Sequence, residues 1–233
     1  MSNIHGIILA RGGSKGILNK NIIDFCGKPL IAWTIEQCLS SKHVSHVWVS
    51  SDSQEILDIA EKYGADFFLR EEDLAGSSIK ADDVVYDFMK KFPGDVTVWV
   101  NSTSPLQTSE EINKVVDYFI ENKLDSLITT KKEFVHSNFN GKPLNYSIGE
   151  TFSKTQDLIP IERFVYSIMA WRNDIFTAEY EKHGHAMFCG KTGTYDVSKE
   201  TSLIVKHAED LKLIDAIVRG REVQSLDVEY YDE

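Results

Sequence analysis

The stretch IHGIILARGGSKGILNKNI, residues Ile4–Ile22, gives the clearest indication of the fold. Its apolar run, IILA, is too short for a membrane span and indicates a buried strand. The glycine-rich turn that follows lets the backbone bend sharply and approach a ligand closely. Because Arg11, Lys15 and Lys20 surround this turn, it favours a polyphosphate site. The alternative is a surface turn with ordinary solvated lysines.

The segments around this loop alternate between strand-like and helix-like patterns. The loop itself has neither the Gly-Lys-Ser/Thr ending of a P-loop nor the G-x-G-x-x-G dinucleotide spacing. Asp52 and Glu55 have the spacing of a capping box with Asp52 as N-cap. The order of the elements predicts a parallel sheet with a phosphate site at the carboxyl ends of its strands. We expect helices over residues 29–41, 52–64, 82–91, 109–122, 173–182 and 208–218, and strands over 44–50, 65–69, 96–100, 124–130, 165–171 and 195–197.

A polar cluster, Asn101-Ser102-Thr103-Ser104, ends the strand predicted over residues 96–100. An open α/β sheet binds its ligand at the carboxyl ends of such strands. The alternative is a simple turn into the next helix, because Thr108 and Glu111 form a second capping box. The two interpretations are compatible, and the cluster remains a candidate substrate contact.

Composition and charge exclude several classes of protein. A formal net charge of -11 argues against a general nucleic-acid partner. No apolar stretch reaches the length of a membrane helix, and the N-terminal run lacks the basic region of a signal peptide. The 3 cysteines are widely spaced, which indicates reduced thiols in a cytoplasm rather than a disulfide framework or a zinc site. We therefore expect a cytoplasmic protein without nucleic-acid or membrane partners.

The segment ARGGSKGILNKNI, followed by GKPLIAWTIEQCLSS, resembles the N-terminus of the acylneuraminate cytidylyltransferases, or CMP-sialic acid synthetases. The resemblance implies an α/β, Rossmann-like three-layer nucleotidyltransferase fold with a mainly parallel sheet, in a single cytidylyltransferase domain over residues 1–233. It also implies a protruding dimerisation arm over residues 134–163, and hence a homodimer. The implied reaction joins CTP to an acidic keto sugar, a sialic-acid-like nonulosonic or related 2-keto acid, and releases pyrophosphate.

The same resemblance assigns site residues. Arg11 and Lys20 take the catalytic positions, and Asn21 has the donor and acceptor that suit reading a pyrimidine edge. Arg70 matches an arginine that holds the nucleotide, although it could instead pair with Glu71 or Glu72. The implied nucleotide contacts are Leu9, Ala10, Arg11, Gly12, Gly13, Ser14, Lys20, Asn21, Arg70 and Ser78. The implied substrate contacts are Asn101, Ser102, Thr103, Ser104 and Gln156.

Magnesium is expected with CTP, but the usual protein ligands for it are missing. The family carries an Asp-x-Asp pair before its last helix, and Ile204 and Lys206 stand at those positions. Lys206 is expected to neutralise phosphate in place of an ion, and Asp196 or Glu200 is the alternative metal ligand. Two other functions stay open: a degenerate nucleotide-binding relative acting as a binding or regulatory subunit, and a nucleotidyltransferase for a different sugar.

Overall fold

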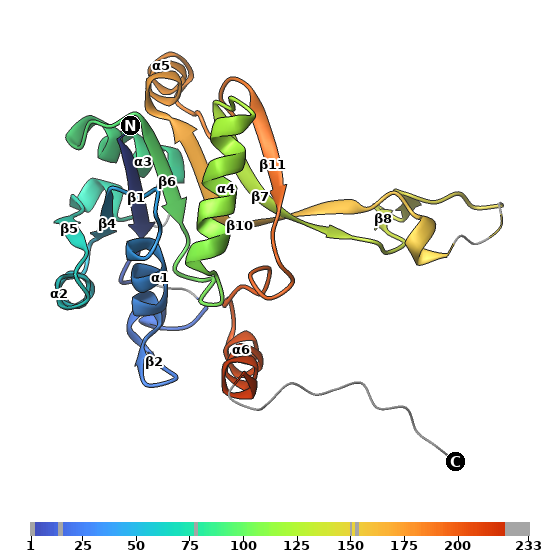
Figure 1. Ribbon diagram of the computed structural model, residues 1–233, viewed down its shortest axis with the longest axis horizontal. Helices are drawn as coiled ribbons and strands as arrows, with labels where there is room; N and C mark the ends of the chain where they lie inside the picture. Colours follow the sequence, from blue (N-terminus) through green and yellow to red (C-terminus); the bar gives the residue numbers. More distant parts are fainter. Residues whose placement is uncertain (1–2, 14–15, 77–78, 150, 152–153, 222–233) are drawn as a thin grey trace.

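A computed structural model describes residues 3–13, 16–76, 79–149, 151 and 154–221 of the chain. Its centre is a seven-stranded sheet in the order β11-β7-β10-β6-β1-β4-β5, in which β10 runs antiparallel to its neighbours (Figure 1). The mainly parallel sheet expected from the sequence is therefore confirmed. The strands are β1 (Ile4–Leu9), β4 (His46–Ser51), β5 (Asp66–Leu69), β6 (Val96–Val100), β7 (Ser126–Glu133), β10 (Ile161–Arg172) and β11 (Thr192–Asp196), and the short hairpins pair β2 (Asp24–Phe25) with β3 (Lys28–Pro29) and β8 (Asn138–Phe139) with β9 (Lys142–Pro143).

Helices cover both faces of the sheet and complete three layers (Figure 1). Residues of α1, α2 and α4 pack on one face, and residues of α3 and α5 pack on the other. The last helix, α6, packs on the β2–β3 hairpin through Phe25 and Ile214. Within the described ranges, no helix has the length and apolar character needed to cross a membrane. The helices are α1 (Leu30–Leu39), α2 (Gln54–Lys62), α3 (Ala81–Lys91), α4 (Ser109–Glu121), α5 (Asn173–His183) and α6 (Ala208–Gly220), with single 3-10 turns η1 (Lys20–Ile22), η2 (Glu72–Leu74) and η3 (Thr155–Asp157).

Strand β1 is buried on both sides, and its sequence explains why. Ile4 and Ile8 contact the layer of α1 and α4, whereas Ile7 contacts the layer of α3 and α5. Successive side chains of a strand point to opposite faces, so a strand covered on both faces needs apolar residues on each. Each such buried side chain contributes about 1.5–3 kcal/mol. The short apolar run therefore fixes β1 inside the sheet, between β4 and β6.

The carboxyl ends of β1, β4 and β6 meet at one edge of the sheet, because these strands are parallel. The neighbouring strand β10 is irregular at this edge, and its register with β7 shifts between Phe164 and Met169. Tyr166 within this irregularity has a left-handed φ of 58°. The carbonyl of Ser167 then accepts a hydrogen bond of 2.8 Å from the backbone N–H of Asn101. The irregular part of β10 thus holds the backbone of Asn101, the residue that follows β6.

The two predicted capping boxes have different outcomes. Thr108 caps α4 as expected, because its hydroxyl accepts a hydrogen bond of 3.2 Å from the backbone N–H of Glu111. The prediction that Asp52 caps α2 is wrong, since the helix begins at Gln54 and has no side-chain cap. Asp52 instead accepts a hydrogen bond of 2.8 Å from the N–H of Gly12. Asp52 therefore binds the backbone of the glycine loop and not the start of α2, where the local pattern had placed it.

The described residues of the arm, 134–149, 151 and 154–163, extend away from the sheet (Figure 1). β7 and β10 run beyond the sheet as a two-stranded ribbon, and β8, β9 and η3 lie at its far end. The expected strand at 165–171 is therefore longer than predicted, because it begins at Ile161 within the arm. The arm exposes large apolar side chains, namely Phe134, Val135, Phe139, Leu144, Ile148 and Ile159.

Candidate functional site

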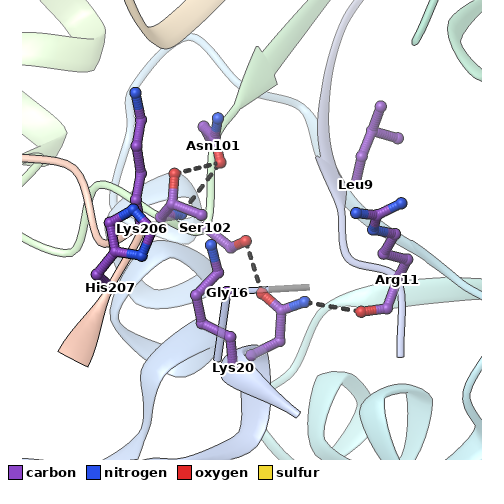
Figure 2. A pocket seen from close by; sticks show the side chains of 10 residues that line it. Leu9, Arg11, Gly16, Lys20, Asn101, Ser102, Lys206 and His207 are labelled. Carbon is purple, nitrogen blue, oxygen red and sulfur yellow. Dashed lines mark hydrogen bonds between the residues drawn. The ribbon is translucent and has the colours of Figure 1, made fainter. Parts of the chain in front are cut away.

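A cavity of about 370 Å³ opens where β1 and β6 end. It brings together the glycine loop, the polar cluster after β6 and the segment before α6 (Figure 2). Arg11 lies on one side of it, Lys206 and His207 lie on the other, and Lys20 lies between them. The lining residues are Leu9, Arg11, Gly16, Lys20, Asn21, Asn101, Ser102, Thr103, Lys206 and His207.

Two backbone N–H groups of the glycine loop already have protein partners. The N–H of Ala10 donates to the carbonyl of Ser50 at 3.0 Å, and the N–H of Gly12 donates to Asp52 Oδ1 at 2.8 Å. Ala10 and Gly12 were expected to contact the nucleotide, and the structure uses their N–H groups to hold the loop against β4 and the residue that follows it. Ser14, a further predicted contact, lies outside the described residues, as does Lys15.

Asn21 joins the loop to the residues after β6. It is 5% exposed, its Nδ2 donates to the carbonyl of Arg11 at 3.1 Å, and its Oδ1 accepts from Ser102 Oγ at 2.8 Å. An amide side chain offers two donor hydrogens and two acceptor lone pairs, so half of its capacity is already used. The geometry therefore gives Asn21 a positioning role, in addition to the ligand contact expected from the sequence.

Lys20 and Arg11 differ in how they are held. Lys20 Nζ donates to the carbonyl of Val205 at 2.9 Å and so ties the loop to the segment before α6. Burial lowers the pKa of Lys20, the charges of Arg11 and Lys206 lower it further, and Asp210 partly raises it. Among the described residues, none pairs with the guanidinium of Arg11 through a hydrogen bond or a salt bridge. Arg11 is thus available to a ligand, whereas Lys20 also has a structural contact.

The opposite side of the cavity comes from the segment between β11 and α6. Asp210 Oδ2 accepts hydrogen bonds from the backbone N–H groups of Lys206 at 2.9 Å and His207 at 2.7 Å. A Cβ atom placed on Gly16 would overlap the backbone oxygen of Lys206, so the two sides touch there. His207 and Gly16 were not predicted as site residues. His207 could have been predicted from the sequence, because its neighbour Lys206 was expected to lie beside phosphate.

The cluster after β6 forms the back of the cavity. Asn101 Oδ1 accepts from the backbone N–H of Thr103 at 3.1 Å and from its hydroxyl at 2.9 Å. The carbonyl of Thr103 accepts from the N–H of Val205 at 2.9 Å. Three members of the predicted cluster line the cavity, but Ser104 is fully buried and does not. The turn into α4 directs Ser104 inward, so a contact with substrate is not supported by its position.

Arg70 lies beside a second cavity, of about 390 Å³, together with Asp52 and Glu71. The guanidinium of Arg70 is buried and donates to Ser50 Oγ at 3.1 Å and to the Ser50 carbonyl at 2.9 Å. Burial lowers the pKa of Arg70. In the described part of the chain it has no salt bridge, and Glu71 pairs with Lys91 instead. A buried cation with neutral partners suits a polar ligand; the other predicted contact, Ser78, lies outside the described residues.

A third cavity, of about 350 Å³, shares Asn101 with the first. We call the first one the cationic cavity, because Arg11, Lys20 and Lys206 line it. The lining of the third cavity is mostly apolar and comes from the start of α3, from β6, β7 and β10, and from the loop after α5, namely Ala81, Trp99, Ile128, Tyr166, Met169, Met187 and Phe188. Sequence reasoning missed this cavity, because its residues come from five separate segments. Gln156, the remaining predicted substrate contact, lies on η3 in the arm and is exposed there, and it does not line the cationic cavity of its own chain.

The residues of the cationic cavity do not fit a metal ion held by the protein. Its described lining contains no carboxylate. Within the described ranges, no three His, Cys, Asp or Glu side chains come together as a metal site. Asp196 is held by Lys131 Nζ at 3.1 Å and by the N–H of Lys132 at 2.7 Å, and Glu200 pairs with Arg221. Neither acidic residue lines the cavity, so the alternative metal ligands are not supported.

Comparison with known proteins agrees with this arrangement. Residues 5–182 match the family model described as cytidylyltransferase. The post-translational flagellin modification protein B of Campylobacter coli is 30% identical over 97% of this chain and all of its own length. The N-acylneuraminate cytidylyltransferase of Escherichia coli is 31% identical over 97% of this chain, which spans 55% of that protein.

A solved structure extends the comparison to the fold. A CMP:2-keto-3-deoxy-manno-octonic acid synthetase, complexed with CTP, superposes with a TM-score of 0.72 over 94% of this chain and 100% of that one. Its sequence identity of 17% supports the fold alone. The resemblance to acylneuraminate cytidylyltransferases, first seen in the glycine loop, is confirmed by the family match and by the named relative. The chain belongs to the cytidylyltransferase family.

Proposed function

We propose that the protein transfers the cytidylyl group of CTP to a hydroxyl of an acidic 2-keto sugar of the nonulosonic class. The observation that carries this proposal is the cationic cavity: Arg11, Lys20 and Lys206 gather at the strand ends of a chain whose net charge is -11. A concentration of positive charge in one concave site is suited to a triphosphate. The name of the E. coli relative supports a sialic-acid-like acceptor.

The reaction needs positioning and charge neutralisation more than covalent help from the protein. An oxygen of the sugar attacks the α-phosphorus of CTP, the bond to the bridging oxygen breaks, and pyrophosphate leaves with the negative charge. The hydroxyl proton passes to solvent or to a phosphate oxygen. Arg11 and Lys20 would stabilise the charge that develops on the phosphates, because preorganised cations act strongly in a partly desolvated cavity. Leu9 and the residues after β6 would orient the reactants.

The base and the acceptor are proposed to occupy the two neighbouring cavities. The cavity beside Arg70 offers a buried guanidinium for the single carbonyl oxygen of cytosine, and Asn21 holds the loop between base and phosphates. The apolar cavity beside Asn101 offers Tyr166 and Phe188 to the carbon skeleton of the sugar. Preference for CTP over ATP and GTP is expected, because a purine needs a longer base pocket.

Homodimer formation is proposed from the arm. Exposed apolar side chains on an extended ribbon favour a protein partner, and a second copy would bring Gln156 toward the cavity of its neighbour. Light scattering at micromolar concentration should find a dimer. The variants Phe139→Asp and Ile148→Asp should shift it toward monomer, whereas Leu18→Asp, equally exposed but outside the arm, should not. A monomeric native protein would contradict the proposal.

A cytoplasmic location is proposed from the thiols. Cys26, Cys38 and Cys189 are all free cysteines, and Cys38 and Cys189 are buried in the apolar layers. Thiols of this kind persist where the surroundings are reducing. Mass spectrometry after thiol labelling of protein from its native source would test the proposal, since oxidised cysteines would contradict it.

The decisive test of the activity is pyrophosphate release. CTP should be consumed in the presence of one or more members of a panel of 2-keto acid sugars, and the CMP-sugar should be found by mass spectrometry. Release with ATP or GTP in place of CTP should be far slower. Binding of CTP with no turnover on any acceptor would instead support the degenerate nucleotide-binding subunit. Release with a sugar phosphate and not with keto acids would support a different acceptor class.

A further inference from the structure

The cationic cavity has an unusual balance of charge for a site that handles a triphosphate. Its described lining contributes three cationic side chains, those of Arg11, Lys20 and Lys206, and it contributes no carboxylate. Magnesium held by a protein generally uses one or two carboxylates, with phosphates and water completing its shell. In this cavity the charge complementary to phosphate is supplied by side chains.

Two carboxylates beside the walls of the cavity are already committed to backbone groups. Asp210 Oδ2 accepts from two N–H groups, those of Lys206 and His207, and these bonds lower the pKa of Asp210. Asp52 Oδ1 accepts from the N–H of Gly12. These two acidic residues therefore shape the walls of the cavity and do not line it.

The segment that carries Lys206 is held firmly in place. The N–H of Val205 donates to the carbonyl of Thr103, and the carbonyl of Val205 accepts from Lys20 Nζ. Gly16 packs against the backbone oxygen of Lys206, and Asp210 binds the N–H of the same residue. The backbone of Lys206 is thus fixed on both sides, while its side chain remains at the cavity. In the part of the chain that the structure describes, no carboxylate forms a salt bridge with Lys206.

We propose that Lys206, together with Arg11 and Lys20, replaces a protein-held divalent metal in binding the phosphates of CTP. This inference rests on the proposed function. A lysine ammonium is a compact point charge with three donors, so it neutralises a phosphate oxygen without the octahedral geometry that magnesium requires. Any magnesium that arrives with CTP is then held by the phosphates and by water. CTP binding by this protein does not require a divalent metal.

The first experiment measures CTP binding by calorimetry with magnesium and with EDTA. The expected result is a dissociation constant in EDTA within about threefold of that in magnesium, because the cations of the protein remain in place. Binding that disappears in EDTA and returns with magnesium would overturn the inference and leave the nucleotide site intact. Absence of CTP binding in both conditions would overturn the proposed function as well.

The second experiment builds a metal site where Lys206 now stands. The double variant Ile204→Asp with Lys206→Asp should bind CTP at least about tenfold more weakly than the native protein in EDTA, and magnesium should restore the binding. Mn²⁺ binding, followed by electron paramagnetic resonance with CTP present, should rise in this variant. Lys212→Asp is the control for the lysine replacement, because it makes the same charge change as Lys206→Asp on the exposed side of α6.

A third arm separates charge from structure. Lys206→Arg should keep CTP affinity in EDTA within about threefold, whereas Lys206→Met should lose about tenfold, and circular dichroism should show both folded. Equal affinity of Lys206→Met and native protein in EDTA would overturn the inference. The variant Asp210→Asn gives a further check. If magnesium changes CTP binding by the native protein but not by this variant, Asp210 is a metal ligand and the inference is overturned.

Discussion

The two sides of the cationic cavity use their polar groups in different ways. On the side of β1, the N–H of Gly12, the amide of Asn21 and the ammonium of Lys20 all have protein partners. On the side of α6, hydrogen bonds hold the backbone of Lys206 and His207, and no described carboxylate forms a salt bridge with the Lys206 side chain. A loop with the composition of a phosphate site can therefore use most of its polar groups for hydrogen bonds within the protein.

The strongest test of this comparison sets Arg11 against Lys20. Arg11→Ala and Lys20→Ala should each weaken CTP binding by about 1.5–3 kcal/mol, as expected for the loss of a charge-assisted contact. Lys20→Ala should also lower the free energy of unfolding, because its Nζ bonds to the carbonyl of Val205. Calorimetry with CTP and urea denaturation measure the two effects. Equal loss of stability in both variants would show that Lys20 contributes no more to the fold than Arg11 does.

The contact between the two sides can be broken at Gly16. Gly16→Ala places a Cβ against the backbone oxygen of Lys206, and overpacking of this kind costs about 1–3 kcal/mol. We expect lower unfolding free energy and weaker CTP binding, since the two sides are pushed apart. Gly13→Ala is the control for stability, because its Cβ would meet nothing within 4 Å. Identical denaturation midpoints for both variants would show that the sides are not in contact.

The anchor of the glycine loop can be removed at Asp52. Asp52→Ala should lower the free energy of unfolding by about 1–2 kcal/mol, because it leaves the N–H of Gly12 without its charged acceptor. Asp52→Asn keeps an oxygen acceptor and should cost less than half of that. Urea denaturation measures both. If Asp52→Asn were as destabilising as Asp52→Ala, the charge would matter and the hydrogen bond would not.

The smallest expected effect reports on how α6 is seated. Burial and a hydrogen bond of 3.1 Å to Asp215 raise the pKa of Cys26 to about 11, so alkylation should be slow at pH 8 and accelerate with rising pH. Asp215→Ala should lower this pKa and speed alkylation at pH 8 severalfold. Glu209→Ala, which removes a charge from the same helix, should not. An unchanged rate in Asp215→Ala would show that α6 does not contact Cys26 in solution.

Much of the fold could be predicted, because it follows from local patterns. The apolar run of β1 and the amphipathic helices α1 and α4 appear where their periodicity places them. The sequence also placed Lys20 and Lys206 near phosphate, and the cavity contains both. The fold predictions succeeded because each depends on residues close together in the chain, and the phosphate contacts of Lys20 and Lys206 stay predictions.

The predictions that failed or were missed depend on distant contacts. Asp52 has the spacing of a helix cap, but Gly12, on another loop, competes for its carboxylate. Ser104 belongs to a polar cluster, yet the packing of α4 buries it completely. Gly16 and His207 become neighbours through the docking of a segment almost two hundred positions away. No spacing rule along one strand or helix encodes such pairs.

The hydrogen bond from Lys20 to Val205 joins residues separated by 185 positions. Closing so long a loop is among the slow steps of folding, because its entropic cost precedes the contacts that reward it. During synthesis on the ribosome, the sheet strands from β1 to β11 leave the exit tunnel before the segment that completes the cavity. A nascent chain therefore completes this cavity only after the segment around Val205 has left the tunnel, and a product that terminates before this segment would lack one side of the cavity.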